Sequence, residues 1–209
     1  MARLKEYNGH YCESEYEYAF IGFLEEEGWK YTSGNKISRV TKRDVLIEDD
    51  FKKFIADGNP DLTEDEVTQI YDTVRLVGAE SDFAALHKVY NWMVDGIQFT
   101  PEDGIARMIP LINFEKDGVK NIFRVVNQFT VEYINNGQKE NRRPDVILYV
   151  NGMPLCIMEL KNPADANATI YDAWEQINIR YWRDIPHLLH YCPLACISDG
   201  VKTSRLNNN

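Results

Sequence analysis

The sequence predicts an α/β protein with a mixed central sheet flanked by helices. Three observations lead to this prediction. Amphipathic helical patterns fill much of the first half of the chain, short apolar strand patterns fill the second half, and an Asn-Gly hairpin signal joins two of those strands. With 209 residues, 44% of them apolar, the chain is long enough for one sizeable core. We expect a single domain over residues 1–209, with a helical insertion at about 43–104 and a core at about 105–200.

The first element is predicted to be a helix that runs to about Glu27 and ends at Gly28. Ser14-Glu15-Tyr16-Glu17 has the spacing of a capping box, in which a Ser and a Glu three residues later each bond the other's backbone N–H. This spacing favours a capping role for Glu17. The alternative is that the Glu17 carboxylate leans toward a metal site as a third acid.

Three amphipathic helices are predicted next, at 43–57, 63–77 and 81–95. Thr63 caps the second, because Glu66 follows three residues later. Breaks rich in Gly, Pro, Asn and Ser separate the three helices. The expected later elements are strands near 108–115, 121–133, 145–150 and 154–161, a helix at about 168–183 and a strand at 193–198.

Asn151-Gly152 lies between two apolar runs and is a strong hairpin signal. A strict two-residue loop would send Asp145 and Glu159 to opposite faces of the sheet, because a slip of one residue reverses every side chain. A three-residue loop with a bulge instead pairs Val150 with Pro154 and Asp145 with Glu159. We predict this second register.

In this register the two faces of the hairpin differ in character. One is entirely apolar and is expected to pack against helices; it carries Val146, Leu148, Val150, Cys156, Met158 and Leu160. The other is mixed and carries Asp145, Ile147, Tyr149, Leu155, Ile157, Glu159 and Lys161. The mixed face is therefore the one that can hold a site.

These residue types suit a magnesium-dependent nuclease. Mg²⁺ prefers oxygen ligands and keeps several waters, so Asp145, Glu159 and the backbone carbonyl of Leu160 are a sufficient set beside a substrate phosphate. Lys161 can hold the attacking water or the developing anion, and the reaction would hydrolyse a phosphodiester. The alternative is a buried Glu-Lys pair kept for packing, which so short a motif taken alone would favour.

The surrounding sequence favours the nuclease. Between Asn121 and Gly200 the chain reads in order Asn-Ile-Phe-Arg-Val-Val-Asn-Gln-Phe-Thr-Val-Glu, Arg-Pro-Asp, Asn-Gly-Met-Pro-Leu, Glu-Leu-Lys-Asn-Pro, Arg-Asp-Ile-Pro and Ile-Ser-Asp-Gly. This order closely resembles the N-terminal nuclease domain of the R subunit (HsdR) of type I restriction-modification enzymes, a branch of the PD-(D/E)XK nucleases. The likeness extends to Glu13–Glu17 and Gly28-Trp29 and covers most of the chain.

The resemblance implies a PD-(D/E)XK core that cuts double-stranded DNA with Mg²⁺, or with Mn²⁺ in its place, through Asp145, Glu159 and Lys161. It also implies a fragment of a longer chain in the cytoplasm of a bacterium or archaeon. Its partners would be motor domains of the same subunit and separate modification and specificity subunits. ATP would act only through the motors, because this sequence has no Gly-x-x-x-x-Gly-Lys phosphate loop. A recombination or repair nuclease and a non-catalytic interaction module are the alternatives.

One spacing departs from the family pattern. The family carries a Gln and a Tyr four residues apart on the helix after the Glu-x-Lys strand, whereas Gln176 and Tyr181 are five apart. In an α-helix this would turn Tyr181 away from Gln176 by about 140°. An inserted residue can be absorbed as a π-bulge, so we predict a widened helix between these two residues. The alternative is that Gln176 faces solvent and Tyr181 is part of the core.

Charge is unevenly distributed along the chain. The formal net charge is −10, but residues 1–104 hold 22 acidic against 11 basic residues, whereas residues 105–209 hold 11 against 12. Five basic residues surround the motif: Lys139, Arg142, Arg143, Arg180 and Arg183. Arg142 and Arg143 are expected to face DNA or to support the site, and the alternative is a solvated basic loop at 139–143 that binds no ligand. Because the second half is only near neutral, we expect other parts of a larger assembly to supply tight DNA binding.

Cysteine and apolar content exclude several classes of protein. The four cysteines form no framework of a small secreted domain, and no N-terminal apolar stretch has the length of a signal or a membrane span. His187, His190, Cys192 and Cys196 lie close in sequence, but their spacing matches no standard zinc site. We expect the cysteines among them to be buried as small apolar side chains.

Overall fold

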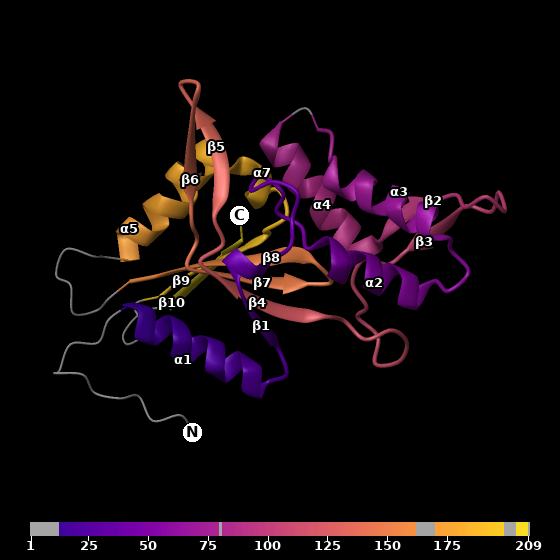
Figure 1. Cartoon of the computed structure of the whole chain (residues 1–209), viewed down its shortest axis with the longest axis horizontal. Coiled ribbons are helices and arrows are strands. Elements are labelled where there is room, and N and C mark those ends of the chain that lie inside the picture. Colours follow the sequence, from indigo (N-terminus) through magenta and orange to yellow (C-terminus); the bar gives the residue numbers. More distant parts are fainter. Residues whose placement is uncertain (1–12, 80, 162–169, 199–203, 209) are drawn as a thin grey trace.

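The structure is a computed structural model that describes residues 13–79, 81–161, 170–198 and 204–208. It has a central sheet with helix α1 (Glu13–Glu26) along one face and the remaining helices toward the other (Figure 1). The six strands of this sheet, in spatial order, are β1 (Lys30–Ser33), β4 (Phe123–Asn127), β7 (Val146–Val150), β8 (Met153–Leu160), β9 (Leu194–Ser198) and β10 (Ser204–Asn208).

The central sheet is mixed, as predicted. β1 runs parallel to β4 and β8 runs parallel to β9, while the other neighbouring pairs are antiparallel. β1 was not predicted, because its sequence, Lys-Tyr-Thr-Ser, is short and polar. Within the described chain, no helix combines the length and the apolar character needed to cross a bilayer.

Two small ribbons accompany the central sheet: β2 (Ile97–Phe99) with β3 (Arg107–Ile109), and β5 (Val131–Asn135) with β6 (Gln138–Arg142). The β5–β6 hairpin projects from the sheet (Figure 1). The single strand predicted at 121–133 is wrong, because Gln128 has a φ of 53° and turns the chain between β4 and β5. A second Asn-Gly turn, Asn136-Gly137, with φ of 49° and 78°, makes the hairpin that the prediction missed.

The helical insertion contains α2 (Glu48–Gly58), α3 (Glu64–Arg75) and α4 (Asp82–Asp95), with a short 3₁₀ turn η1 (Gly34–Lys36) before it. The predicted capping box of Thr63 and Glu66 is confirmed. The first of the three helices begins at Glu48 and not near 43, because the backbone of Ile47 is extended. Val45, Leu46 and Ile47 are buried. The N–H of Ile47 donates to the carbonyl of Gly152 over 2.8 Å, which holds that segment against the hairpin turn.

The β7–β8 hairpin brings Asp145 opposite Glu159 as predicted, but through a different loop and bulge. Val150 pairs with Met153, so the loop has two residues, and the predicted three-residue loop is wrong. A bulge further along pairs Leu148 with Cys156, which leaves Leu155 as the extra residue. From there Val146 pairs with Met158, and continuing this register by one residue brings Asp145 opposite Glu159.

The turn is tight because of what Asn151 and Gly152 do. Their φ angles are 51° and 77°, the positive values of a type I′ turn. The buried Asn151 side chain accepts from the N–H of Ile122 and donates to the carbonyl of Leu111, at 2.7 and 2.9 Å. These bonds fix a two-residue turn, so the one-residue offset has to be absorbed in β8.

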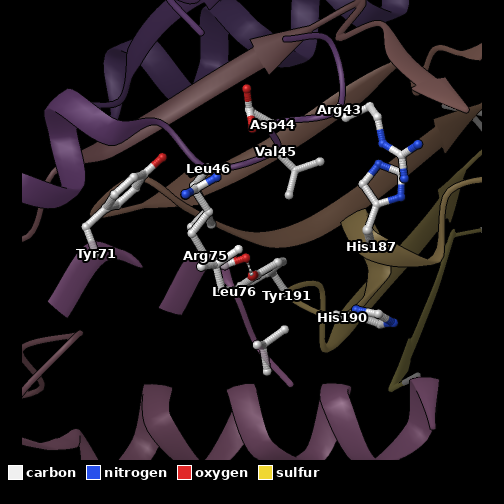
Figure 2. A pocket seen from close by; sticks show the side chains of 11 residues that line it. Arg43, Asp44, Val45, Leu46, Tyr71, Arg75, Leu76, His187, His190 and Tyr191 are labelled. Atoms are coloured by element: carbon white, nitrogen blue, oxygen red, sulfur yellow. Dashed lines mark hydrogen bonds between the residues drawn. The ribbon is translucent and has the colours of Figure 1, made fainter. Parts of the chain in front are cut away.

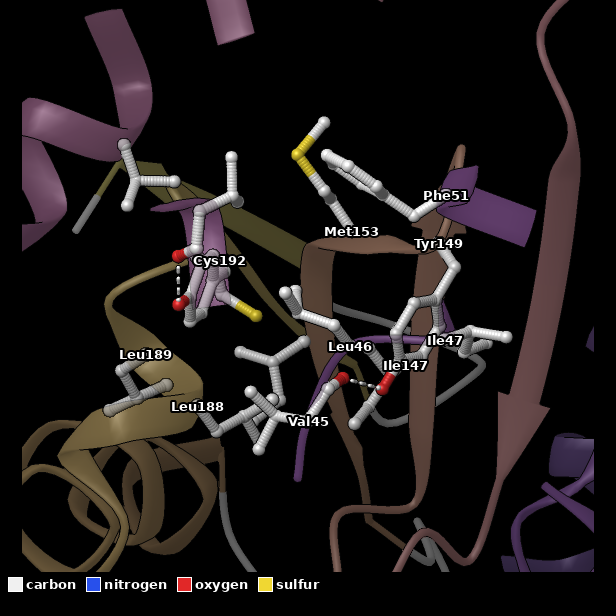
Figure 3. Close-up of a cluster of buried hydrophobic side chains, with 14 of the residues drawn as sticks. Val45, Leu46, Ile47, Phe51, Ile147, Tyr149, Met153, Leu188, Leu189 and Cys192 are labelled. Carbon is white, nitrogen blue, oxygen red and sulfur yellow. Dashed lines mark hydrogen bonds between the residues drawn. The ribbon is translucent and has the colours of Figure 1, made fainter. Parts of the chain in front are cut away.

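Both faces of the hairpin are buried. The small cluster on one face contains Ile21 and Leu24 of α1 together with sheet residues of the predicted apolar face: Val146, Cys156, Met158 and Leu160. The large core lies on the other face and contains Ile147, Tyr149 and Ile157 (Figure 3). There the Tyr149 hydroxyl donates to the carbonyl of Val45 over 3.0 Å. The hairpin is therefore held from both sides at the strands that carry the site.

Gly152→Ala should destabilise the chain more than Gly137→Ala does. Both glycines have a φ close to 78°, so either alanine adopts a left-handed conformation that costs about 1–2 kcal/mol. A Cβ at Gly152 would also collide with the backbone of Ile47 and Phe51, whereas a Cβ at Gly137 meets nothing within 4 Å. We expect about 1–3 kcal/mol of additional loss at Gly152, measured by urea unfolding. Equal losses would contradict the close packing of this turn.

Candidate functional site

Asp145, Glu159 and Lys161 come together in the middle of the sheet, where β7 begins and β8 ends. The Oδ2 atom of Asp145 accepts the backbone N–H of Leu160 over 2.8 Å, which ties the start of β7 to the end of β8. Glu159 has no solvent exposure, and its Oε2 lies 4.0 Å from the Lys161 Nζ, which is 14% exposed. Two carboxylates and one ammonium group therefore share this point of the sheet.

The helix after β8 widens where the sequence predicts it. It consists of α5 (Ile170–Glu175), a π-helical segment η2 (Gln176–Tyr181) and α6 (Trp182–Asp184), so the prediction of a widened helix is confirmed. The predicted start at 168 lies outside the described residues. Because one extra residue fits into the turn, Gln176 and Tyr181 both point at Glu159, and the alternative of a solvent-facing Gln176 is wrong.

These two side chains satisfy the buried carboxylate. The Gln176 amide donates to Oε2 of Glu159 and the Tyr181 hydroxyl donates to Oε1, both at 2.6 Å. The same amide lies 2.8 Å from the Tyr181 hydroxyl, and the Lys161 Nζ donates to the Gln176 Oε1 over 3.3 Å. Without such donors a fully buried carboxylate would cost several kcal/mol.

Glu17 is a third acid beside the site. Its side chain is 4% exposed; Oε1 accepts from the Asn127 amide at 2.5 Å, and Oε2 accepts from the Gln128 amide at 2.8 Å. The capping role predicted for Glu17 is wrong, because α1 already includes Glu13 and the carboxylate faces β4. Burial raises the pKa of Glu17, and the negative charge of Asp145 adds to the rise. Such a position for Glu17 was expected from the sequence only as the alternative to capping.

Burial raises the pKa of each of these acids. For Asp145, the Leu160 N–H and the Lys161 charge offset part of the effect. For Glu159 the pKa rises well above its usual value, first because of burial and then because of the Asp145 charge. The hydrogen bond donated by Tyr181 lowers the pKa and offsets part of this rise. For Glu17, burial outweighs the two amide hydrogen bonds. A cluster of acids in which ionisation is disfavoured attracts a cation, which would stabilise the ionised forms.

A polar cavity of about 660 Å³ opens beside the acids. Gln176 and Tyr181 line it, together with four basic side chains: Lys42, Arg142, Arg143 and Arg180. Arg142 is 2.6 Å from Asp184, so it also ties β6 to α6. Arg143 is exposed and acts electrostatically on Glu17 and Asp145. Lys42 was not predicted, because it comes from a segment far away in the sequence.

The residues of the zinc alternative do not converge. Cys192 belongs to the large core, whereas Cys196 packs against the small cluster on the opposite face of the sheet. His190 lies 2.8 Å from Asp82. In the described part of the chain, no three His, Cys, Asp or Glu side chains gather to hold a metal ion. A metal at the candidate site would therefore rest on two carboxylates and a backbone oxygen.

A separate cavity of about 390 Å³ lies between α3, the extended segment before α2, and α7 (Pro186–Leu189) (Figure 2). His187 and Arg43 lie close together there. Burial, helped by the charge of Arg43, lowers the pKa of His187 to about 4, so this side chain is neutral. None of the three acids lines this cavity, which is distinct from the candidate site.

Comparison with known proteins identifies the family. The model of the family described as type I restriction enzyme R protein N terminus matches residues 11–209. The chain belongs to this family. It contains the N-terminal domain of a type I restriction enzyme endonuclease subunit.

Two relatives match most of this chain. A putative type I restriction enzyme MjaIXP endonuclease subunit from Methanocaldococcus jannaschii is 35% identical over 197 residues. The type I restriction enzyme HindI endonuclease subunit from Haemophilus influenzae is 30% identical over 203 residues. Each match covers 90% of this chain but only 18% of the relative. Endonuclease subunits from Staphylococcus aureus are 33% identical over 94 residues, which is 45% of this chain and 9% of the relative.

Deletion of Ile179 should leave the site intact. The deletion places Gln176 and Tyr181 four residues apart, so a regular α-helix can direct both side chains at Glu159. Insertion of one alanine after Ile179 is the matched control, because a second extra residue turns Tyr181 away. We expect urea unfolding to show about 1 kcal/mol or less of loss for the deletion and at least about 3 kcal/mol for the insertion. Equal losses would mean that the hydrogen bonds to Glu159 do not set the helix geometry.

Glu159→Gln should stabilise the chain at about pH 8 but not at about pH 4. The raised pKa means that the folded chain holds this proton more tightly than the unfolded chain does. Stability therefore falls as pH rises from the usual glutamic acid pKa toward the raised one, and the variant avoids this loss. Urea unfolding with a chelator present should show a gain that grows with pH.

Asp184→Asn is the control of opposite sign. Arg183, and then Arg142, lower the pKa of Asp184, so this carboxylate contributes stability at neutral pH that is lost as pH falls through the lowered value. The variant should therefore lose stability at about pH 8 and less near pH 3. If the stability of both variants changed with pH in the same direction, the environments assigned to Glu159 and Asp184 would be wrong.

Proposed function

We propose that this chain is the Mg²⁺-dependent nuclease domain of a type I restriction enzyme R subunit, with a core of the PD-(D/E)XK type. It hydrolyses phosphodiester bonds of double-stranded DNA. The observation that carries the proposal is the convergence of Asp145 and Glu159 from adjacent strands, with Lys161 beside them. Family membership favours this function over a recombination or repair nuclease, and the cost of burying three acids argues against a module that never binds a cation.

The residues fit Mg²⁺. Asp145 and Glu159 offer carboxylate oxygens, and the Leu160 carbonyl belongs to the residue whose N–H already bonds Asp145. Such an oxygen-only set suits Mg²⁺, and Mn²⁺ can replace it. When bound, the ion lowers the pKa of a coordinated water and stabilises charge on the phosphoryl oxygens.

The chain's own residues do the rest. Gln176 and Tyr181 hold both oxygens of Glu159, which fixes the orientation of this ligand before substrate arrives. The Lys161 Nζ, held by the Gln176 carbonyl oxygen, lies where it can orient the attacking water or stabilise the developing anion. Glu17 is a further carboxylate near Asp145 and adds to the attraction for a cation.

The basic cavity is where the DNA backbone approaches. Arg143, Lys42 and Arg180 line it beside Gln176 and Tyr181, so a phosphate bound there lies next to the acids. Arg142 contributes charge while it stays paired with Asp184. With a net charge of −10 the chain binds DNA weakly by itself. The proposed assembly therefore includes motor domains of the same subunit, which use ATP, and the modification and specificity subunits, in the cytoplasm of a bacterium or archaeon.

Asp145→Ala and Lys161→Ala should each abolish double-strand cutting by the reconstituted complex. The first removes a metal ligand and the second removes the ammonium group at the reacting phosphate, so we expect losses of at least about 10²-fold. Cutting is measured on plasmid DNA with Mg²⁺ and ATP, and ATP hydrolysis should stay unchanged.

Lys139→Ala is the matched control for this test. Lys139 is a basic residue on the nearby β6 strand, is 73% exposed, and bonds Glu132. This variant should cut DNA at the rate of the unchanged complex. Cutting retained by Asp145→Ala or by Lys161→Ala would refute the assigned roles.

A further inference from the structure

A large apolar groove lies apart from the acids. Its volume is about 720 Å³, and it runs between α4, the loop after β3, and the sheet ends of β4, β7 and β9. The most exposed apolar side chains that line it are Phe83 (73%), Phe114 (71%), Tyr90 (50%), Val94 (50%) and Phe123 (40%). None of these residues lines the basic cavity. A gathering of exposed apolar side chains of this size marks an interaction surface.

Helix α4 explains why the groove needs a partner. Its inward face is buried and carries Ala85, Leu86, Val89 and Met93. Phe83, Tyr90 and Val94 form a second apolar stripe, because they are spaced seven and four residues apart and so lie on one side of the helix. Within the described chain this stripe stays open to solvent. A helix that is apolar on two sides is expected to be covered on both.

The end of the described chain lies beside this groove. Asn208, the last residue of β10, pairs with Leu194 of β9, and Leu194 lines the groove. The matched family is named for the N terminus of the R protein, and this chain covers only 18% of the two relatives that match most of it. Most of the length of these two relatives therefore lies outside the region that this chain matches.

We propose that the groove binds an apolar segment of the polypeptide that follows this domain in the full-length R subunit. The proposal rests on the assignment of the chain to that subunit. The area favours a tethered partner: the five exposed side chains offer on the order of 500 Å², less than the roughly 800 Å² per partner of a stable free interface. A segment on the same chain needs less area, because tethering gives it a high effective concentration.

Photo-crosslinking of the full-length R subunit tests this. Phe83 and Phe114 are replaced, one at a time, by benzoylphenylalanine, which keeps an aromatic ring at each position. The same replacement at Ile105, which is 69% exposed and does not line the groove, is the control. After irradiation, mass spectrometry identifies the crosslinked peptides. We expect both groove positions to crosslink within one polypeptide to a segment beyond residue 209, and the control to yield at most a tenth as much.

Other outcomes overturn the proposal. Crosslinks between two R subunits would assign the groove to a second copy, and crosslinks to a modification or specificity subunit would assign it to that partner. Yields no higher than those of the control would mean that nothing covers the groove. The crosslink needs neither DNA nor metal, so it can be measured in the Lys161→Ala background. A failure here therefore leaves the nuclease assignment intact, and a failure of cutting leaves the crosslink interpretable.

A second measurement covers the case in which the modified residue disturbs the groove. Phe83→Ser combined with Phe114→Ser should raise the rate of limited proteolysis just after residue 209 about tenfold, because removing two apolar anchors favours the undocked state. Ile105→Ser should leave that rate unchanged. Equal rates in all three proteins would contradict docking.

Discussion

The buried carboxylate of Glu159 is the constraint on which the rest of this site depends. It lies in the middle of the sheet with no exposure, so each of its oxygens needs a donor. Gln176 and Tyr181 provide those donors, and they do so from one helix only because that helix widens into a π-helical turn. The π-helical backbone of this segment therefore follows from the need of both Glu159 oxygens for a hydrogen-bond donor. A regular helix of the same sequence would leave one oxygen of this acid without its donor.

The same requirement extends through the sheet to α1. Asp145 uses one oxygen to accept the Leu160 N–H, and its carbonyl accepts the N–H of Gln128. Gln128 and Asn127 in turn donate to Glu17. The positive φ of Gln128, which ends β4, therefore coincides with the point where that residue serves two acids at once. The elements on both faces of the sheet meet at these groups, so the acids cannot shift without moving α1, β7 or β8.

Much of this arrangement could be predicted from the sequence, and the exceptions have physical causes. Pairing Asp145 with Glu159 was predictable because only that register gives the hairpin one purely apolar face. The position of the bulge was not, since it depends on distant residues that bind Asn151. The widened helix was predictable from the spacing of Gln176 and Tyr181. The role of Glu17 was predicted wrongly. Its local sequence fits a capping box, but its carboxylate is bound by Asn127 and Gln128, which lie more than a hundred residues away in the sequence. β6 was missed because its polar sequence hides a strand that only its Asn-Gly turn reveals.

The distribution of charge indicates how such a domain can work in an assembly. The acidic half of the chain supplies the helical insertion, and the basic side chains that line the cavity at the site come from segments distant in sequence, Lys42 and Arg180 among them. A cavity with few basic groups orients a phosphate without holding DNA tightly, because affinity grows with the number of phosphates neutralised. Under the proposed function, weak DNA binding by this domain would leave the control of DNA entry to other parts of the complex. The apolar groove on α4 and this cavity share no lining residue. If both proposals hold, the domain would be anchored through one surface and receive DNA at the other.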